Sequence, residues 1–186
     1  MRIISGSAKG KKILIPENKN TRPLKYMVRE SIFNILAHSD LLPSKIENIN
    51  ILDLFSGIGS FGLEAISRGA KKCLFVENYP SALLSLDKNI KNLKCQESSH
   101  LNKLDCFKFI ENVQKNELKL DIIFLDPPYR EERINFIIEE ILKKNILNKN
   151  GIIIVHRHKK DNIKLTEKLN IIDLRLYGIS KIIFAN

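Results

Sequence analysis

The sequence predicts an α/β fold with a seven-stranded, mostly parallel sheet that includes a final antiparallel strand. From about residue 49 onward, apolar runs of strand length alternate with segments of helical period, as in βαβ units around a parallel sheet. The last two strands are joined at Gly178, a connection too short for a parallel crossover, so we expect them to pair antiparallel. A basic hairpin and a helix precede the sheet. We expect one domain over residues 1–186, with an N-terminal extension at 1–45 and a core at 46–186.

Each expected element rests on the spacing of its apolar residues. In the extension, apolar pairs on either side of the stretch from Gly6 to Gly10 predict a hairpin, and helical period predicts a helix from Lys25 to about Ser39. Strands are expected at 49–54, 72–76, 99–104, 122–125, 152–156, 171–177 and 181–185, the third being the weakest. Helices are expected at 60–67, 81–93, 106–113, 133–143 and 163–169.

Composition favours a soluble protein with a polyanionic partner. A hydrophobic fraction of 44% and a charged fraction of 28% are ordinary for a globular chain, whereas the net charge of +10 favours a partner such as nucleic acid. The apolar runs are too short for a membrane span, and the first residues carry no signal-peptide pattern. The cysteines lack CxxC spacing, and His156 and His158 lack an evident third ligand. We expect a cytoplasmic monomer with no metal and no membrane partner.

The tetrapeptide Asp126-Pro127-Pro128-Tyr129 is the strongest candidate for a catalytic site. It directly follows the apolar run 122–125, and open α/β sheets bind their ligands where such parallel strands end. Proline fixes φ and has no N–H, so the backbone carbonyls here point in set directions. The Asp126 carboxylate and the Pro127 carbonyl are acceptors beside the flat Tyr129 ring, which suits a planar group with an exocyclic NH2. The alternative is a plain strand and turn, which Pro-Pro alone often means.

A second motif predicts a bound adenosine. Gly57, Gly59 and Gly62 match G-x-G-x-x-G after a strand and at the opening of a helix, where a ligand can approach the backbone. Glu77 ends the next strand about twenty residues on, where a ribose-binding acid usually stands. The cofactor-binding candidates are Asp53, Phe55, Gly57, Gly59, Gly62, Glu77, Asp105, Cys106 and Asp126.

The acids near this turn favour S-adenosylmethionine over a dinucleotide. Asp53 and Asp126 both end strands, and two carboxylates facing a pyrophosphate would repel it by on the order of 1–4 kcal/mol. S-adenosylmethionine has no phosphate and carries an ammonium and a cationic sulfur. Asp105 is expected either to bind the adenine amino group or to cap the helix that follows it, and the sequence leaves both open.

At this point the chain resembles a known family. The glycine motif, Glu77 and Asp126 to Tyr129 look like motifs of class I (Rossmann-like) methyltransferases that modify exocyclic amines. Over essentially the full length, the chain is similar to the bacterial RsmD family, in the segments 2–6, 21–23, 28–34, 52–57, 62–65 and 67–70. The resemblance implies methylation of N2 of a guanine in 16S rRNA, on small-subunit particles, with S-adenosylmethionine as donor and S-adenosylhomocysteine as product.

The chain departs from the family pattern in three places. The segment 24–27 replaces a usual Thr and a basic residue, Ser5 replaces a usual Gly, and His156 stands where an acid is common. Substrate contacts at the first and last of these positions therefore stay open.

The basic N-terminal segment is the expected RNA-binding surface, since Lys and Arg neutralise phosphates. The candidates are Arg2, Lys9, Lys11, Lys12, Arg22, Arg29 and Arg130. Any single Lys could instead be a solvated surface residue, and Arg29 could pair with acids of the fold. Two other functions stay open: methylation of adenine N6 or of a glutamine amide, which the same tetrapeptide serves, and a non-catalytic role in ribosome assembly.

Overall fold

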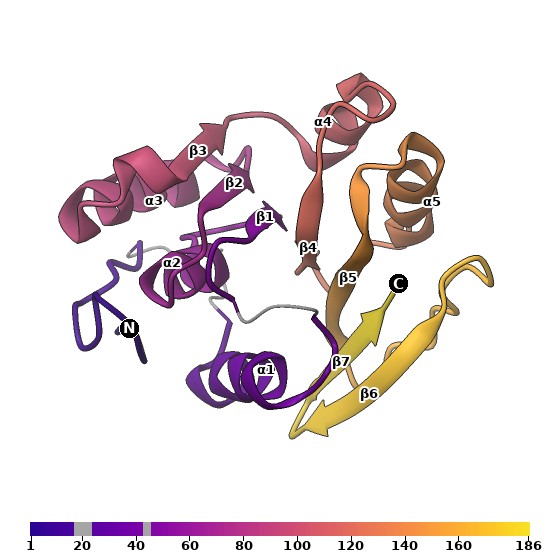
Figure 1. Ribbon diagram of the computed structural model, residues 1–186, viewed down its shortest axis with the longest axis horizontal. Coiled ribbons are helices and arrows are strands. Elements are labelled where there is room, and N and C mark those ends of the chain that lie inside the picture. Colours follow the sequence, from indigo (N-terminus) through magenta and orange to yellow (C-terminus); the bar gives the residue numbers. More distant parts are fainter. Residues whose placement is uncertain (17–23, 43–45) are drawn as a thin grey trace.

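Seven strands form one sheet in the computed structural model, which describes residues 1–16, 24–42 and 46–186 (Figure 1). The strand order is β3-β2-β1-β4-β5-β7-β6, and only β7 runs antiparallel to its two neighbours, β5 and β6. The strands are β1 (Asn50–Leu54), β2 (Lys72–Val76), β3 (Ser99–Asn102), β4 (Leu120–Leu125), β5 (Leu147–His158), β6 (Ile171–Tyr177) and β7 (Ser180–Ala185). The predicted sheet, including its final antiparallel strand, is confirmed.

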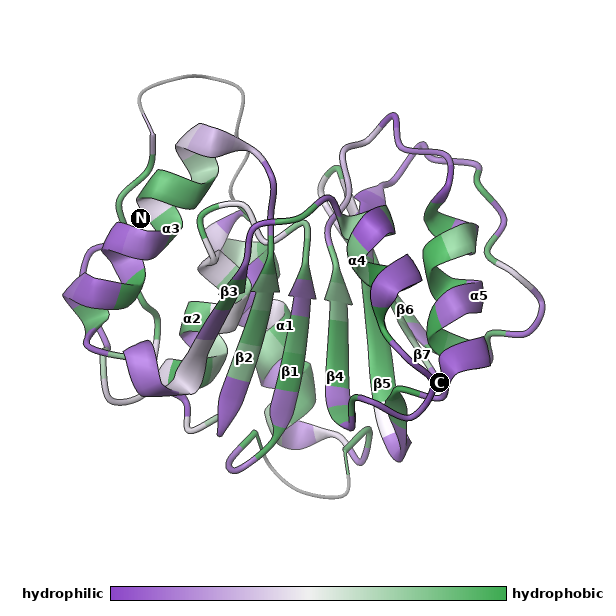
Figure 2. Ribbon diagram, turned by 90° about the horizontal axis from the view of Figure 1, so that it is seen from above, coloured by the Kyte–Doolittle hydropathy of each residue, from purple (hydrophilic) through white to green (hydrophobic). Residues whose placement is uncertain are grey.

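Helices cover both faces of the sheet (Figures 1 and 2). On one face lie α1 (Tyr26–His38), α2 (Ser60–Ser67) and α3 (Pro80–Leu93), and on the other lie α4 (Cys106–Asn112) and α5 (Ile134–Lys144). A short 3-10 helix, Gln96–Ser98, precedes β3.

Strand side chains alternate between these two layers. In β4, Ile122 and Phe124 join the core beneath α1 to α3, whereas Ile123 and Leu125 join the core beneath α4 and α5. Figure 2 shows the resulting apolar central strands, whose carboxyl ends all lie at one edge of the sheet. This period of two decides which polar side chains at that edge face the same layer.

The N-terminal segment forms the predicted hairpin and packs into the core. Arg2 and Lys12 form an antiparallel bridge, and Ile3 and Ile13 are buried in the cluster that contains α2. The backbone N–H groups of Ile4 and Ser5 donate to the Glu64 carboxylate of α2 at 2.7 and 3.0 Å. The hairpin is therefore an integral part of the fold.

The helix predicted at 163–169 is wrong, because this stretch has no helix. Hydrogen bonds to a side chain of α5 engage its backbone groups instead: the Asn135 side chain donates to the Lys164 carbonyl and accepts from Thr166 N–H, at 2.9 and 3.0 Å. Smaller differences are that β3 ends at Asn102 and that β5 begins at Leu147. No helix in the described part of the chain is long and apolar enough to cross a membrane.

Candidate active site

A cavity of about 760 Å³ opens at the carboxyl ends of β1, β2 and β4. Strand order reverses between β1 and β4, and this is the position where open α/β sheets bind ligands. The volume is in the range of small-molecule sites. We divide the cavity into a β1–β2 half, formed by Phe55, Gly57, Glu77 and Asp105, and a β4–β5 half, formed by the tetrapeptide 126–129 with His156 and Ser180.

The β1–β2 half begins with a turn in left-handed backbone geometry. Phe55, Gly57 and Gly59 have φ of 58°, 55° and 79°. Positive φ is rare for a bulky residue such as Phe, and such outliers cluster at functional sites. Phe55 N–H donates to the Cys106 thiol at 3.2 Å, and Gly57 N–H donates to Glu77 at 2.7 Å. The side chains of Cys106 and Glu77 therefore fix the backbone of this turn.

The three glycines of the motif do different work. A Cβ on Gly57 would meet no atom within 4 Å, so this residue borders open space in the cavity. A Cβ on Gly59 would lie 2.4 Å from Leu86, and one on Gly62 would lie 2.4 Å from Phe75. Gly57 alone of the three lines the cavity, whereas Gly59 and Gly62 let α2 pack closely.

Glu77 joins the turn to the next loop. One carboxylate oxygen accepts from Gly57 N–H, and the other accepts from the N–H groups of Asn78 and Tyr79 at 2.9 and 2.8 Å. A carboxylate has about four acceptor positions, so one is left for a ligand hydroxyl. Glu77 lines the cavity, as the sequence predicts.

The prediction that Asp53 binds the cofactor is wrong, because its side chain does not face the cavity. Its side chain is 1% exposed, and Oδ2 accepts from Gly62 N–H at 3.0 Å, within the packing between β1 and α2. Burial raises the pKa of Asp53 well above its usual range, with the neighbouring acids adding to the effect. Asp53 therefore positions α2, and its charge cannot act on a ligand in the cavity, contrary to the prediction from the sequence.

The charged residues that line the cavity still disfavour a pyrophosphate. Its acids are Glu77, Asp105, Asp126 and Glu131, and its lysine and arginine are Lys25 and Arg133. Arg133 is paired with Glu131 at 3.0 Å, which leaves an acidic excess on the other lining residues. An anionic pyrophosphate is disfavoured here, and a cationic ligand is favoured.

Asp105 caps α4, which was one of its two predicted roles. Oδ1 accepts from the N–H groups of Phe107 and Lys108 at 3.0 and 3.2 Å. Oδ2 lies 3.4 Å from the Asn78 amide, and the residue also lines the cavity, so the cap does not exclude a ligand contact. Cys106 lies behind the turn, and burial raises the pKa of its thiol. It supports Phe55 and does not line the cavity.

In the β4–β5 half, Arg157 fixes the backbone of the tetrapeptide. Its guanidinium donates to the carbonyls of Pro128 and Tyr129 at 3.3 and 3.2 Å, and it is paired with Asp161. The Arg157 side chain is buried, so these bonds are shielded from water. Arg157 was not among the sequence-predicted site residues, since only strand register brings it to this loop.

His156 contacts the carboxylate of Asp126. Nδ1 lies 2.7 Å from Asp126 Oδ1, and Nε2 lies 2.9 Å from Ser180 Oγ of β7. The parallel register pairs Leu125 with Val155, so the next residues of β4 and β5 stand side by side and face the same layer. The Tyr129 ring meets the His156 ring edge-on at 6.3 Å.

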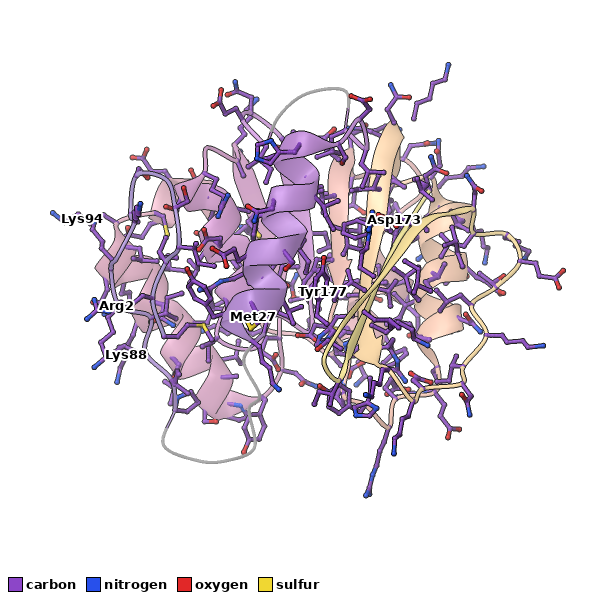
Figure 3. The ribbon with its side chains drawn as sticks, turned by 90° about the horizontal axis from the view of Figure 1, so that it is seen from below. Arg2, Met27, Lys88, Lys94, Asp173 and Tyr177 are labelled. Atoms are coloured by element: carbon purple, nitrogen blue, oxygen red, sulfur yellow. The ribbon has the colours of Figure 1, made fainter. Side chains whose placement is uncertain are left out.

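The predicted RNA-binding residues do not form one surface. Arg2, Lys9, Lys11 and Lys12 are exposed on the hairpin, whose Ser7 contacts Ser67 at the end of α2. The far end of α2 is roughly 10 Å from its start at the cavity. Figure 3 shows Arg2 on the flank that also carries Lys88 of α3 and Lys94, the residue that follows α3.

The prediction that Arg29 binds RNA is wrong, because its side chain is fully buried. The guanidinium lies 3.8 Å from Glu64 and donates to the Ser60 carbonyl at 3.3 Å, so it joins α1 to α2 and cannot reach a phosphate. Burial lowers the pKa of Arg29. Arg130 is exposed next to Tyr129, and Arg22 lies outside the described residues. Within the described ranges, no group of His, Cys, Asp and Glu could hold a metal ion.

Comparison with known proteins identifies the family. A family model described as "Conserved hypothetical protein 95" matches residues 1–186. A ribosomal RNA small subunit methyltransferase D from Buchnera aphidicola subsp. Acyrthosiphon pisum (strain APS) is 36% identical over 163 residues, which cover 87% of this chain and 80% of the relative. The chain belongs to the RsmD family.

Solved structures agree with an RsmD fold. The structure of yhhF from Escherichia coli matches with a TM-score of 0.83 and 26% identity, over 100% of this chain and 96% of that chain. A structure described as a methyltransferase complexed with S-adenosylhomocysteine matches with a TM-score of 0.66 over 87% of this chain and 50% of that chain. At 18% identity the latter shares the fold alone. The architecture is that of a class I methyltransferase, as the sequence predicts.

Proposed function

We propose that this protein transfers a methyl group from S-adenosylmethionine to the exocyclic N2 of a guanine in 16S rRNA. The observation that carries the proposal is the Asp126 carboxylate, which shares one cavity with the Glu77 turn and with Tyr129. Membership of the RsmD family and the names of its relatives support rRNA as the substrate.

The β1–β2 half fits the adenosine of S-adenosylmethionine. Gly57 offers open backbone, Glu77 has acceptor capacity for ribose hydroxyls, and Asp105 lines the cavity with acceptor capacity for the adenine amino group. The acidic excess of the lining suits the ammonium and the sulfonium. When bound, this cofactor supplies an electrophilic methyl group on a cationic sulfur.

The β4–β5 half fits the acceptor amine. Guanine N2 is a poor nucleophile because its lone pair is delocalised into the ring. The Asp126 carboxylate and the Pro127 carbonyl accept hydrogen bonds from the amino group, which frees the lone pair and stabilises the positive charge that develops on nitrogen. Tyr129 stacks on the base. Bound S-adenosylmethionine would supply the methyl group and leave with the C–S electron pair, and Asp126 would accept the surplus N2 proton.

The basic hairpin and the flank of α3 fit a folded RNA. Their lysines and arginines would contact phosphates at a distance from the target base, while the exposed Arg130 directly follows Tyr129, which lines the cavity. A stacked guanine must first leave its stack, which costs a few kcal/mol. We therefore propose residues 1–45 as an RNA-binding extension and residues 46–186 as the cofactor-binding core of a cytoplasmic monomer.

The test is methylation of 16S rRNA by the purified protein. Small-subunit particles from a strain that lacks the corresponding methyltransferase are incubated with radiolabelled S-adenosylmethionine, and the modified nucleotide is identified by nuclease mapping and mass spectrometry. We expect one N2-methylguanine. Label in N6-methyladenine or in protein would assign the alternative amine, and binding of S-adenosylmethionine without transfer to any particle would indicate a non-catalytic assembly factor.

A further inference from the structure

The contact between His156 and Asp126 gives the catalytic carboxylate a fixed orientation. Asp126 Oδ1 lies 2.7 Å from His156 Nδ1, and no hydrogen bond within the described ranges reaches Asp126 Oδ2. The Asp126 side chain is 20% exposed and lines the cavity. Rotation about the last bond of an Asp side chain is broad, so a single strong bond decides which oxygen faces the cavity.

A second bond fixes His156 in turn. His156 and Ser180 are 5% and 1% exposed, and their side chains meet at 2.9 Å through Nε2 and Oγ. A carboxylate can only accept, so with Asp126 ionised the proton must be on Nδ1. In the neutral ring Nε2 is then an acceptor, and the Ser180 hydroxyl donates to it. The three side chains form one continuous hydrogen-bonded chain across β4, β5 and β7.

We propose that His156, held by Ser180, is a positioning residue for methyl transfer that keeps Asp126 oriented with Oδ2 toward the acceptor amine. This inference rests on the proposed function. It assigns a role to a position where the sequence departs from the family pattern. His156 acts through Asp126, so its removal lowers kcat and leaves cofactor affinity unchanged.

The discriminating pair of variants is His156→Phe and His156→Asn. Phe keeps a ring of similar size but has no donor, whereas Asn places an amide N–H near the position of Nδ1. A hydrogen bond to a charged group contributes enough that its loss should lower kcat by about 10- to 100-fold in the Phe variant. The Asn variant should recover to within about threefold of wild type, because it restores that donor to the carboxylate. The KM for RNA and the Kd for S-adenosylhomocysteine should stay the same in both.

His100→Phe is the matched control, because His100 is an exposed histidine of β3 outside the cavity lining. A second readout needs no activity: nitrogen NMR of the histidine rings should find His156 with its proton on Nδ1, and Ser180→Ala should change that signal. Equal kcat losses for Phe and Asn, or a proton on Nε2 alone, would overturn the proposal. Wild-type protein that transfers no methyl group would overturn the proposed function instead, and the NMR result would still decide the positioning of Asp126.

Discussion

The two halves of the cavity are built from different kinds of contact. In the β1–β2 half, the Glu77 carboxylate accepts hydrogen bonds from backbone N–H groups of its own loop and of the neighbouring turn. In the β4–β5 half, side chains from β5 contact the carboxylate and the loop carbonyls, and Ser180 of β7 contacts one of these side chains, His156. In the first half, the contacts are mainly between backbone N–H groups and the Glu77 side chain. In the second, they form a side-chain network around the short loop of residues 126–129. Binding and chemistry should therefore respond to different substitutions.

Asp126→Ala should have the largest effect on turnover. Losing the acceptor of the transition-state charge should lower kcat by about 10²- to 10⁴-fold. Cofactor affinity should stay within about tenfold, because the charge that Asp126 stabilises exists only in the transition state. Single-turnover methylation and calorimetry with S-adenosylhomocysteine measure the two quantities. Near wild-type turnover would remove Asp126 from the mechanism.

Glu77→Gln should give the opposite pattern. It weakens the acceptor for ribose hydroxyls and for the turn, so affinity for S-adenosylmethionine should fall by about 10- to 100-fold. Turnover at saturating cofactor should change little, because the β4–β5 half is intact. The check is a titration followed by rates at high cofactor concentration. A loss of kcat with unchanged affinity would contradict the division of the cavity.

Arg157→Lys should have an intermediate effect. Lysine keeps the charge but cannot reproduce the planar fork that reaches two carbonyls, so the tetrapeptide loses one of its fixed contacts. We expect kcat to fall by about tenfold with unchanged affinity for S-adenosylhomocysteine. Arg175→Lys is the matched control, since Arg175 is an exposed arginine paired with Asp173 on β6. Equal effects of the two substitutions would exclude a role in positioning the loop.

Neutralising Lys9, Lys11 and Lys12 together should have a smaller effect that depends on salt. If each meets a phosphate, the log–log salt slope of RNA affinity should flatten by up to ~2–3 units. Lys88 of α3 and Lys94, which follows α3, provide a comparison on the same flank. Affinity for small-subunit particles is measured across a salt series. An unchanged slope in the triple variant would make the hairpin a solvated surface and direct attention to Arg130.

Asp53→Asn should have the smallest effect on binding, with cofactor affinity within about threefold of wild type. A group whose folded pKa is raised contributes stability below its ordinary pKa, near 3.9 for Asp, and loses it as pH rises toward the folded value. The Asn variant cannot ionise and does not lose this stability, so the difference between its melting temperature and that of the wild type should rise in its favour as pH increases above about 4. A large loss of affinity at neutral pH would restore Asp53 as a charged ligand residue.

The sequence predicted the local motifs better than the burial and the tertiary contacts of their residues. Alternating apolar runs predicted the sheet, and spacing predicted that Glu77 and Asp126 would share an edge. Burial was harder to predict: Asp53 and Arg29 stand in motifs but face the core, because strand and helix period turns them toward α2. Arg157 and Ser180 were missed because strand register brings Arg157 to the carbonyls of Pro128 and Tyr129, and brings Ser180 to His156. The predicted helix at 163–169 failed because tertiary bonds from Asn135 overrode a helical pattern.

The position of β7 has a consequence for the order in which the protein becomes active. β7 follows every other described strand in the sequence, yet it is inserted between β5 and β6. During synthesis, the Glu77 turn can therefore be complete while the place beside β5 is still empty. The Ser180 contact to His156 forms only when β7 enters that place, by pairing with two strands made before it. The orientation of Asp126 therefore depends on a strand that is synthesised after β1, β2 and β4, whose carboxyl ends carry the rest of the cavity.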